Sequence, residues 1–162
     1  MTEASAQKLQ QQARAFRDRF ASVLLSTASS DGKPLASYAP YVLDDQEALC
    51  AYLSELAPHT RNLMTNPRVS LLFINEEHEA RNPFARERLV LECRAEQVPE
   101  AESEPLLQKM SDRFGNTLDL LRSLPDFHLF RFQVKTGSYI QGFGKAWSLR
   151  GNRLAIEALR GR

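Results

Sequence analysis

The chain has 162 residues, of which 43% are hydrophobic, 25% charged and 9% aromatic. This composition predicts one folded globular domain and is too apolar for a disordered chain. Twenty-one lysines and arginines offset twenty acidic residues, and this balance argues against nucleic acid or an anionic membrane as the main partner. No apolar run reaches the roughly 18 residues of a transmembrane helix. Because the first twenty residues also contain no hydrophobic signal core, we expect a cytoplasmic protein.

The first half of the sequence predicts a helix followed by a β-meander. Leu9, Ala13, Phe16 and Phe20 recur on one face of an amphipathic helix that we place at about residues 3–20. The next predicted elements are three strands joined by short turns, at 22–28, 35–43 and 49–53. Tight turns between consecutive strands are typical of an antiparallel sheet rather than of βαβ units.

The second half predicts alternating helices and strands. We expect Thr60 to cap a short helix over 61–65 and Ser103 to open a longer one within 99–124. The predicted strands are 69–74, 89–98, 127–134 and 138–143, the last two separated by a turn at Thr136-Gly137. We place the barrel at about 21–147 and a short tail at 148–162. Six or seven antiparallel strands with a few helices indicate an α+β fold built on a small closed or half-open barrel.

Cysteines and histidines are too sparse for a disulfide framework or a zinc site. Cys50 and Cys93 lie 43 positions apart and belong to no CxxC pair, so we expect two reduced, partly buried residues. Only three histidines are present, and their spacing with the cysteines does not match a set of four zinc ligands.

One motif with chemical potential directly follows a predicted strand. His59, Thr60 and Arg61 converge on the start of the predicted helix, where free backbone N–H groups and the helix dipole favour an anion. A phosphate or carboxylate would be bound by the Thr60 hydroxyl, the amides and Arg61. The alternative interpretation is a capped surface helix with an exposed arginine.

Two further clusters contain candidate binding residues. Arg81, Arg86 and Arg88 flank Phe84 in a polar segment and are suited to clamp a carboxylate, unless they form a charged loop paired with nearby glutamates. Asp126 precedes His128 by two residues, a spacing that lets a carboxylate fix an imidazole tautomer. The alternative there is a strand cap beside a surface histidine.

Five strings of the sequence, in this order, resemble a known family. They are SELAPHTRNL (54–63), NPRVSLL (66–72), NPFARERL (82–89), PDF (125–127) and GSYIQGFG (137–144). Together they resemble the pyridoxamine 5′-phosphate oxidase-like, FMN-binding split-barrel superfamily, and within it the haem-utilisation branch. The resemblance covers roughly residues 15–147.

This resemblance implies a homodimer of split β-barrels, with cofactor sites in the grooves between subunits. Flavin-binding relatives hold the FMN phosphate with basic residues at the position of Pro58-His59, where this chain offers only His59. Haem-degrading relatives use an axial histidine near the C-terminus, to which an aspartate of the partner subunit is bonded, and Asp126 matches that aspartate. Arg86 matches an arginine on the haem side. No histidine follows His128 in this sequence, so His59 and His128 are the candidate iron ligands.

Three hypotheses follow. The first is a haem-iron utilisation protein that binds or degrades haem at the dimer interface, with Arg86 near the propionates and Asp126 behind the iron ligand. The second is a flavin-dependent oxidoreductase with the FMN phosphate at His59, Thr60 and Arg61. The third is a non-catalytic dimer that acts as a binding or storage module. Whether the protein is an enzyme stays open among them, and none predicts a nucleic-acid or membrane partner.

Overall fold

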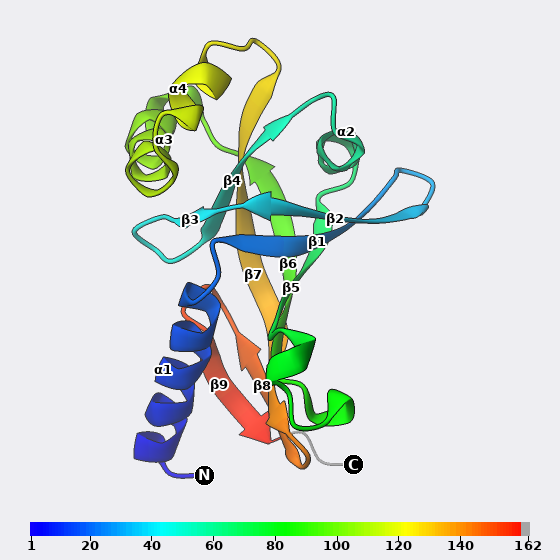
Figure 1. The fold of residues 1–162 in the computed structure, drawn as a ribbon, viewed down its shortest axis with the longest axis vertical. Helices are drawn as coiled ribbons and strands as arrows, with labels where there is room; N and C mark the ends of the chain where they lie inside the picture. The colour runs from blue at the N-terminus through cyan, green and yellow to red at the C-terminus, as the bar shows by residue number, and fades with distance from the viewer. Residues whose placement is uncertain (160–162) are drawn as a thin grey trace.

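The computed structural model describes residues 1–159 and shows one strongly curled antiparallel sheet flanked by helices (Figure 1). The helices are α1 (Glu3–Asp18), α2 (Pro58–Thr65), α3 (Glu100–Phe114) and α4 (Thr117–Arg122), with short 3-10 turns η1 (Glu77–Glu79) and η2 (Pro83–Ala85). The strands are β1 (Ser22–Ala28), β2 (Pro34–Pro40), β3 (Val42–Leu43), β4 (Leu49–Ser54), β5 (Arg68–Ile74), β6 (Arg88–Gln97), β7 (Phe127–Gly142), β8 (Lys145–Arg150) and β9 (Ala155–Leu159). None of the helices in this part of the chain has the length and apolar character needed to cross a bilayer.

The sheet has the order β2-β1-β5-β6-β7-β4-β3, and β8 and β9 extend it from β7. Every pairing is antiparallel, and the sheet curls into a half-barrel (Figure 1). This confirms the predicted α+β split-barrel fold. The helix predicted at 3–20 is also confirmed as α1, which begins at the Thr2 N-cap.

The two strands predicted at 127–134 and 138–143 are one continuous strand, β7, so the predicted turn at Thr136-Gly137 is wrong. Gly137 lies inside the sheet between Leu91 on β6 and Leu149 on β8. A Cβ atom at residue 137 would lie 2.5 Å from the carbonyl oxygen of Val90. The glycine is therefore required by the close approach of β6 and not by a turn.

The sheet also continues beyond residue 147. The Gly142-Phe143-Gly144 segment forms a tight bend, with both glycines at positive φ and a register shift beside Ile140. The chain returns as β8, and β9 then pairs with β8 within the segment predicted to be a short tail. Residues 160–162 of that tail lie outside the described residues.

Two helices begin earlier than predicted. Helix α2 begins at Pro58 with Ala57 as its N-cap, so Thr60 is not the cap but lies within the first turn. Proline is favoured at this first helical position because its φ is already helical and it has no N–H to satisfy. Helix α3 begins at Glu100, and the Ser103 hydroxyl donates back to the carbonyl oxygen of Pro99 instead of opening the helix.

The apolar core is divided into two parts by the sheet. The larger part fills the half-barrel and includes Leu71, Leu91 and Phe132, all fully buried. The smaller lies between the sheet and helices α3 and α4, where Leu106 and Met110 pack on Leu129. Cys50 and Cys93 are buried free thiols, as predicted. Burial raises the pKa of each to about 12, so both are protonated and poorly reactive at neutral pH.

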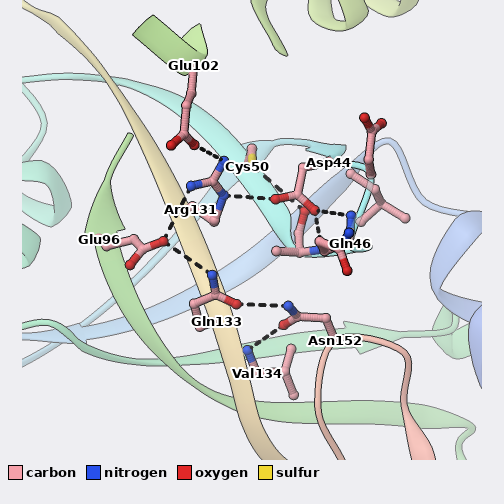
Figure 2. Close-up of polar contacts among 12 residues, drawn as sticks. Asp44, Gln46, Cys50, Glu96, Glu102, Arg131, Gln133, Val134 and Asn152 are labelled. Atoms are coloured by element: carbon pink, nitrogen blue, oxygen red, sulfur yellow. Dashed lines mark hydrogen bonds and ion pairs between the residues drawn. The ribbon is translucent and has the colours of Figure 1, made fainter. Parts of the chain in front are cut away.

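Arg131 on β7 joins α3 and the β3–β4 turn to the sheet (Figure 2). Its Nε donates to Asp44 at 2.8 Å and its NH2 group to Glu102, on α3, at 2.9 Å. A third carboxylate, that of Glu96, lies 3.4 Å from its NH1 group. The guanidinium side chain is only 14% exposed, so these contacts are partly shielded from water and fix α3 over the sheet.

Candidate functional site

The site begins at His59, which the proline start of α2 places in the first turn of that helix. Its Nδ1 lies 2.9 Å from the Ser37 hydroxyl on β2, and its Nε2 has no hydrogen-bond partner within residues 1–159. Burial lowers the pKa of His59 because it disfavours the charged imidazolium. A neutral imidazole with one nitrogen oriented by a neighbour and the other unpartnered is suited to bind a metal ion.

His59 lines a cavity of about 570 Å³ beneath α3 and α4. The walls are mainly apolar and aromatic, with Tyr38, Tyr52, Phe114, Phe127, Met110 and Leu121 among them. Cavities of this size and character accept small organic ligands, and their few polar groups fix the ligand's orientation. Here those groups include the His59 imidazole and the Ser54 hydroxyl.

Asp126 and His128 lie beside this cavity, at the junction of β4 and β7. The Ser54 hydroxyl donates to the Asp126 carboxylate at 2.5 Å. The Gln97 amide donates to Nδ1 of His128 at 3.0 Å, and Nε2 of His128 lies 2.5 Å from the Glu55 carboxylate. Both ring nitrogens of His128 are therefore engaged, and ligation of a metal would require one of these contacts to break.

Thr60 and Arg61 follow His59 in α2 but face different surroundings. Thr60 is fully buried, and its hydroxyl oxygen has no partner among the described residues. The Arg61 guanidinium donates to the carbonyl oxygens of Glu55 and Leu56 at 2.9 and 3.1 Å. A phosphate at this helix terminus would thus find a covered hydroxyl and an arginine already bound to backbone.

Arg86 is not part of this group within one chain. It follows η2, in the green segment at the end of the sheet opposite α2 (Figure 1). Its Nε donates to the carbonyl oxygen of Asn75 at 2.5 Å, and its NH1 lies 3.9 Å from the Glu77 carboxylate. The next residue, Glu87, accepts a short hydrogen bond from the Tyr139 hydroxyl. The Glu87 contact braces the segment against β7, and the Arg86 contacts join it to the residues that follow β5.

Several cavity residues were missed by sequence reasoning. Ser37 and Tyr38 lie on β2, where the sequence shows only ordinary strand residues. The cavity residues of α3 and α4 lie within the helix predicted at 99–124, but nothing in their sequence pattern indicates which surface they cover. Tyr52 and Phe127 lie next to the motifs that contain His59 and Asp126. This proximity is the one sequence feature that could have indicated them as cavity residues.

The family model for pyridoxamine 5′-phosphate oxidase matches residues 9–141. The chain belongs to this family. The resemblance to this family inferred from the motifs is therefore confirmed. The chain is 39% identical over 150 residues to heme oxygenase HutZ of Vibrio cholerae, covering 91% of this chain and 84% of that protein. This match confirms the haem-utilisation branch as well.

Two solved structures of the family support the same relationship. A crystal structure of V. cholerae HutZ, described as a heme storage protein, matches with a TM-score of 0.71 at 36% identity, over 76% of this chain and 88% of that one. Campylobacter jejuni ChuZ matches with a TM-score of 0.82 at 26% identity, over 96% of this chain and 65% of that one. The split-barrel architecture thus extends across nearly the whole chain.

Proposed function

We propose that this family member is a haem-iron utilisation protein that binds haem in the cavity beneath α3 and α4, with His59 as the iron ligand. The proposal rests on the position of His59. Its neutral imidazole is oriented through Nδ1 by Ser37 and lies on the wall of a mainly apolar and aromatic cavity. A porphyrin is a planar apolar ring, and its iron is commonly held by a histidine. The relative HutZ is a heme oxygenase, and this similarity supports haem as the ligand.

The walls of the cavity fit this group. Tyr38, Tyr52 and Phe127 offer aromatic surface for the ring. Burial keeps His59 neutral to lower pH than an exposed imidazole, so the nitrogen lone pair is available at neutral pH. With His59 as its protein ligand, a bound haem would supply oxygen chemistry at this site. Asp126 and Ser54 border the cavity and would orient polar groups at its edge.

We further propose that two chains complete the site as a homodimer. Outward-facing apolar side chains lie on the face of β1 and β2, where Leu24 is 45% and Tyr38 66% exposed. At the other end of the sheet Phe84 and Phe143 are 84% and 67% exposed beside the Arg86 segment. Such surfaces are typical of interaction sites. A twofold pair would allow Arg86 of one chain to meet the cavity of the other and bind haem propionates there.

The flavin alternative is less well supported by the same residues. FMN needs a phosphate site, but Thr60 is buried and Arg61 is bound to two carbonyl oxygens. His59 alone would face the phosphate, and its lowered pKa disfavours the charge that a phosphate requires. The same cavity is therefore better suited to a porphyrin ring than to a flavin phosphate.

The test is a haem titration of the purified protein, followed by the Soret band, with His59→Ala and His128→Ala beside the wild type. His78→Ala is the matched control, because His78 is exposed on η1. We expect saturable binding by the wild type and His78→Ala, and at least tenfold weaker binding with a shifted Soret band in His59→Ala.

A parallel titration with FMN separates the two cofactors. Saturable FMN binding without a haem signal would overturn the haem proposal in favour of the flavin. Wild-type haem binding by His59→Ala, with loss in His128→Ala, would transfer the ligand role to His128. Absence of binding for both cofactors would support the non-catalytic alternative and contradict the proposed function.

A further inference from the structure

A second cavity, of about 580 Å³, is lined by a different set of residues from the proposed haem cavity. Its lining residues come from β1, β5, β6 and β7 and from Pro34 at the start of β2. Its lining includes Arg68, Arg94, Lys135, Glu92, Ser26 and Ser70. We refer to it as the basic groove. Nothing in the proposed haem site uses it.

The cations of the basic groove lack partners. Arg68 on β5 stands directly opposite Arg94 on β6 in the strand register. Neither side chain, nor that of Lys135, forms a hydrogen bond or ion pair within residues 1–159. Like charges placed directly opposite each other destabilise a sheet. A bound anion would remove this repulsion.

A β-bulge presents the third cation. Glu92 pairs with Thr136 and the next residue, Cys93, pairs with Val134, so Lys135 is the extra residue on β7. Bulges re-aim a side chain relative to the regular alternation of a strand. In this case the bulge adds Lys135 to the groove that already holds the arginine pair.

The remaining polar groups suit an anion. Ser26 on β1 faces Ser70 on β5 across the strands, and Ser70 in turn faces Glu92 on β6. Glu92 is the single acidic residue that lines the groove, and it accepts a hydrogen bond from the Thr136 hydroxyl at 3.1 Å. Three cations and one carboxylate leave a net charge of +2. The more buried Arg131, in contrast, contacts three carboxylates (Figure 2).

We propose that the basic groove binds a small anion with at least two negative charges, carried by phosphate or carboxylate groups. Paired guanidinium groups match both chemistries because each offers two parallel N–H donors. The serine hydroxyls supply further donors, and the volume accommodates an organic anion of moderate size. The proposal goes beyond haem binding and does not depend on it.

The test is isothermal titration calorimetry at low salt with pyrophosphate and, separately, citrate. The variant is Arg68→Gln/Arg94→Gln, and the matched control is Lys8→Gln/Lys145→Gln, which removes two positive charges from exposed positions that do not line the groove. We expect saturable binding of one anion per chain, weakened at least tenfold in the groove variant and unchanged in the control. Lys135→Gln alone should weaken binding to a smaller extent, and it keeps the test valid if the double variant does not fold.

The two titrants distinguish the source of the charge. Saturable binding of pyrophosphate alone indicates a phosphorylated ligand, and binding of citrate alone a polycarboxylate; either outcome supports the site. Equal weakening in the groove variant and the control would show general charge screening and overturn it. If the wild type binds neither anion saturably, the proposed anion site is also overturned. This holds even if the reason is that a second copy of the chain covers the groove.

Discussion

The Ser37 hydroxyl lies 2.9 Å from Nδ1 of His59 and so connects β2 to the first turn of α2. This contact fixes the rotation of the imidazole ring at the wall of the cavity. A partner on one ring nitrogen determines the tautomer and strengthens the other nitrogen as a ligand. The N-cap of α2 makes no side-chain hydrogen bond. The contact with Ser37 therefore fixes the position of His59 at the start of this helix.

Removal of the Ser37 hydroxyl should weaken haem binding without removing it. We expect Ser37→Ala to lower the affinity by roughly tenfold, the lower end of the effect of lost partners on metal-binding histidines. A Soret titration measures the change. Ser22→Ala, an exposed strand serine on β1, is the control. Equal affinities for wild type and Ser37→Ala would argue that His59 is not the ligand.

The lowered pKa of His59 predicts how stability depends on pH. The imidazole has an ordinary pKa of 6.5, and burial lowers it in the folded chain. As pH falls below 6.5, the unfolded chain takes up the proton first, so the free energy of unfolding decreases until the folded-state pKa is passed. Urea denaturation between pH 7.5 and pH 5, read as the difference between wild type and His59→Gln, should show this decrease.

The control for that experiment is His78→Gln, because His78 is exposed. We expect the His78→Gln protein to retain the pH dependence of the wild type. An identical pH dependence for wild type and His59→Gln would contradict the buried neutral imidazole.

The proposed dimer predicts a specific effect at Leu24. Its side chain is 45% exposed on β1, opposite the exposed Tyr38 of β2 and beside Leu72 of β5. A charge there should be costly only if the face is covered by another chain. We expect Leu24→Asp to change the molar mass from dimer to monomer in sedimentation equilibrium. Leu120→Asp, at an exposed leucine of α4, should leave a dimer, and a monomeric wild type would contradict the proposal.

The sequence predicted the sheet well because strand periodicity and turns are local properties. Strand β1 begins and ends at the predicted residues, since alternation and a Ser-Asp-Gly turn both lie within a few positions. One error arose where a residue serves a distant contact, because Gly137 marks the approach of Val90 rather than a turn. The other was local, because Pro58 moves the start of α2 ahead of the polar residue that looked like its cap.

Part of the candidate site could be proposed from the sequence for the same reason. His59, Asp126 and His128 come from short motifs, and the structure brings them to the same region of the sheet. Ser37, Tyr38 and the α3 side chains come from elements remote in sequence. The basic groove depends on strand register and a bulge, neither of which a single sequence specifies.

The Arg131 contacts predict an unequal response to loss of charge. Arg131 is 14% exposed and contacts Asp44, which is 12% exposed. Arg150 and Glu157 form a pair exposed to 71% and 43%. We expect Arg131→Gln to lower the free energy of unfolding by about 1–3 kcal/mol, and Arg150→Gln by less than about 1 kcal/mol. Urea denaturation measures both, and equal effects would show that the Arg131 contacts add nothing beyond a surface pair.

The close approach at Gly137 predicts that even one added methyl group is destabilising. The new Cβ atom would meet the Val90 carbonyl oxygen at 2.5 Å and side-chain carbons of Leu91 and Leu149 at 2.9 Å. Backbone on β6 must then shift, and such overpacking typically costs about 1–3 kcal/mol. We expect Gly137→Ala to lower the urea midpoint accordingly. Ala36→Ser, which adds one heavy atom at an exposed position of β2, should stay within about 0.5 kcal/mol of the wild type. An unchanged midpoint for Gly137→Ala would mean that β6 and β7 are less closely packed in solution than the structure shows.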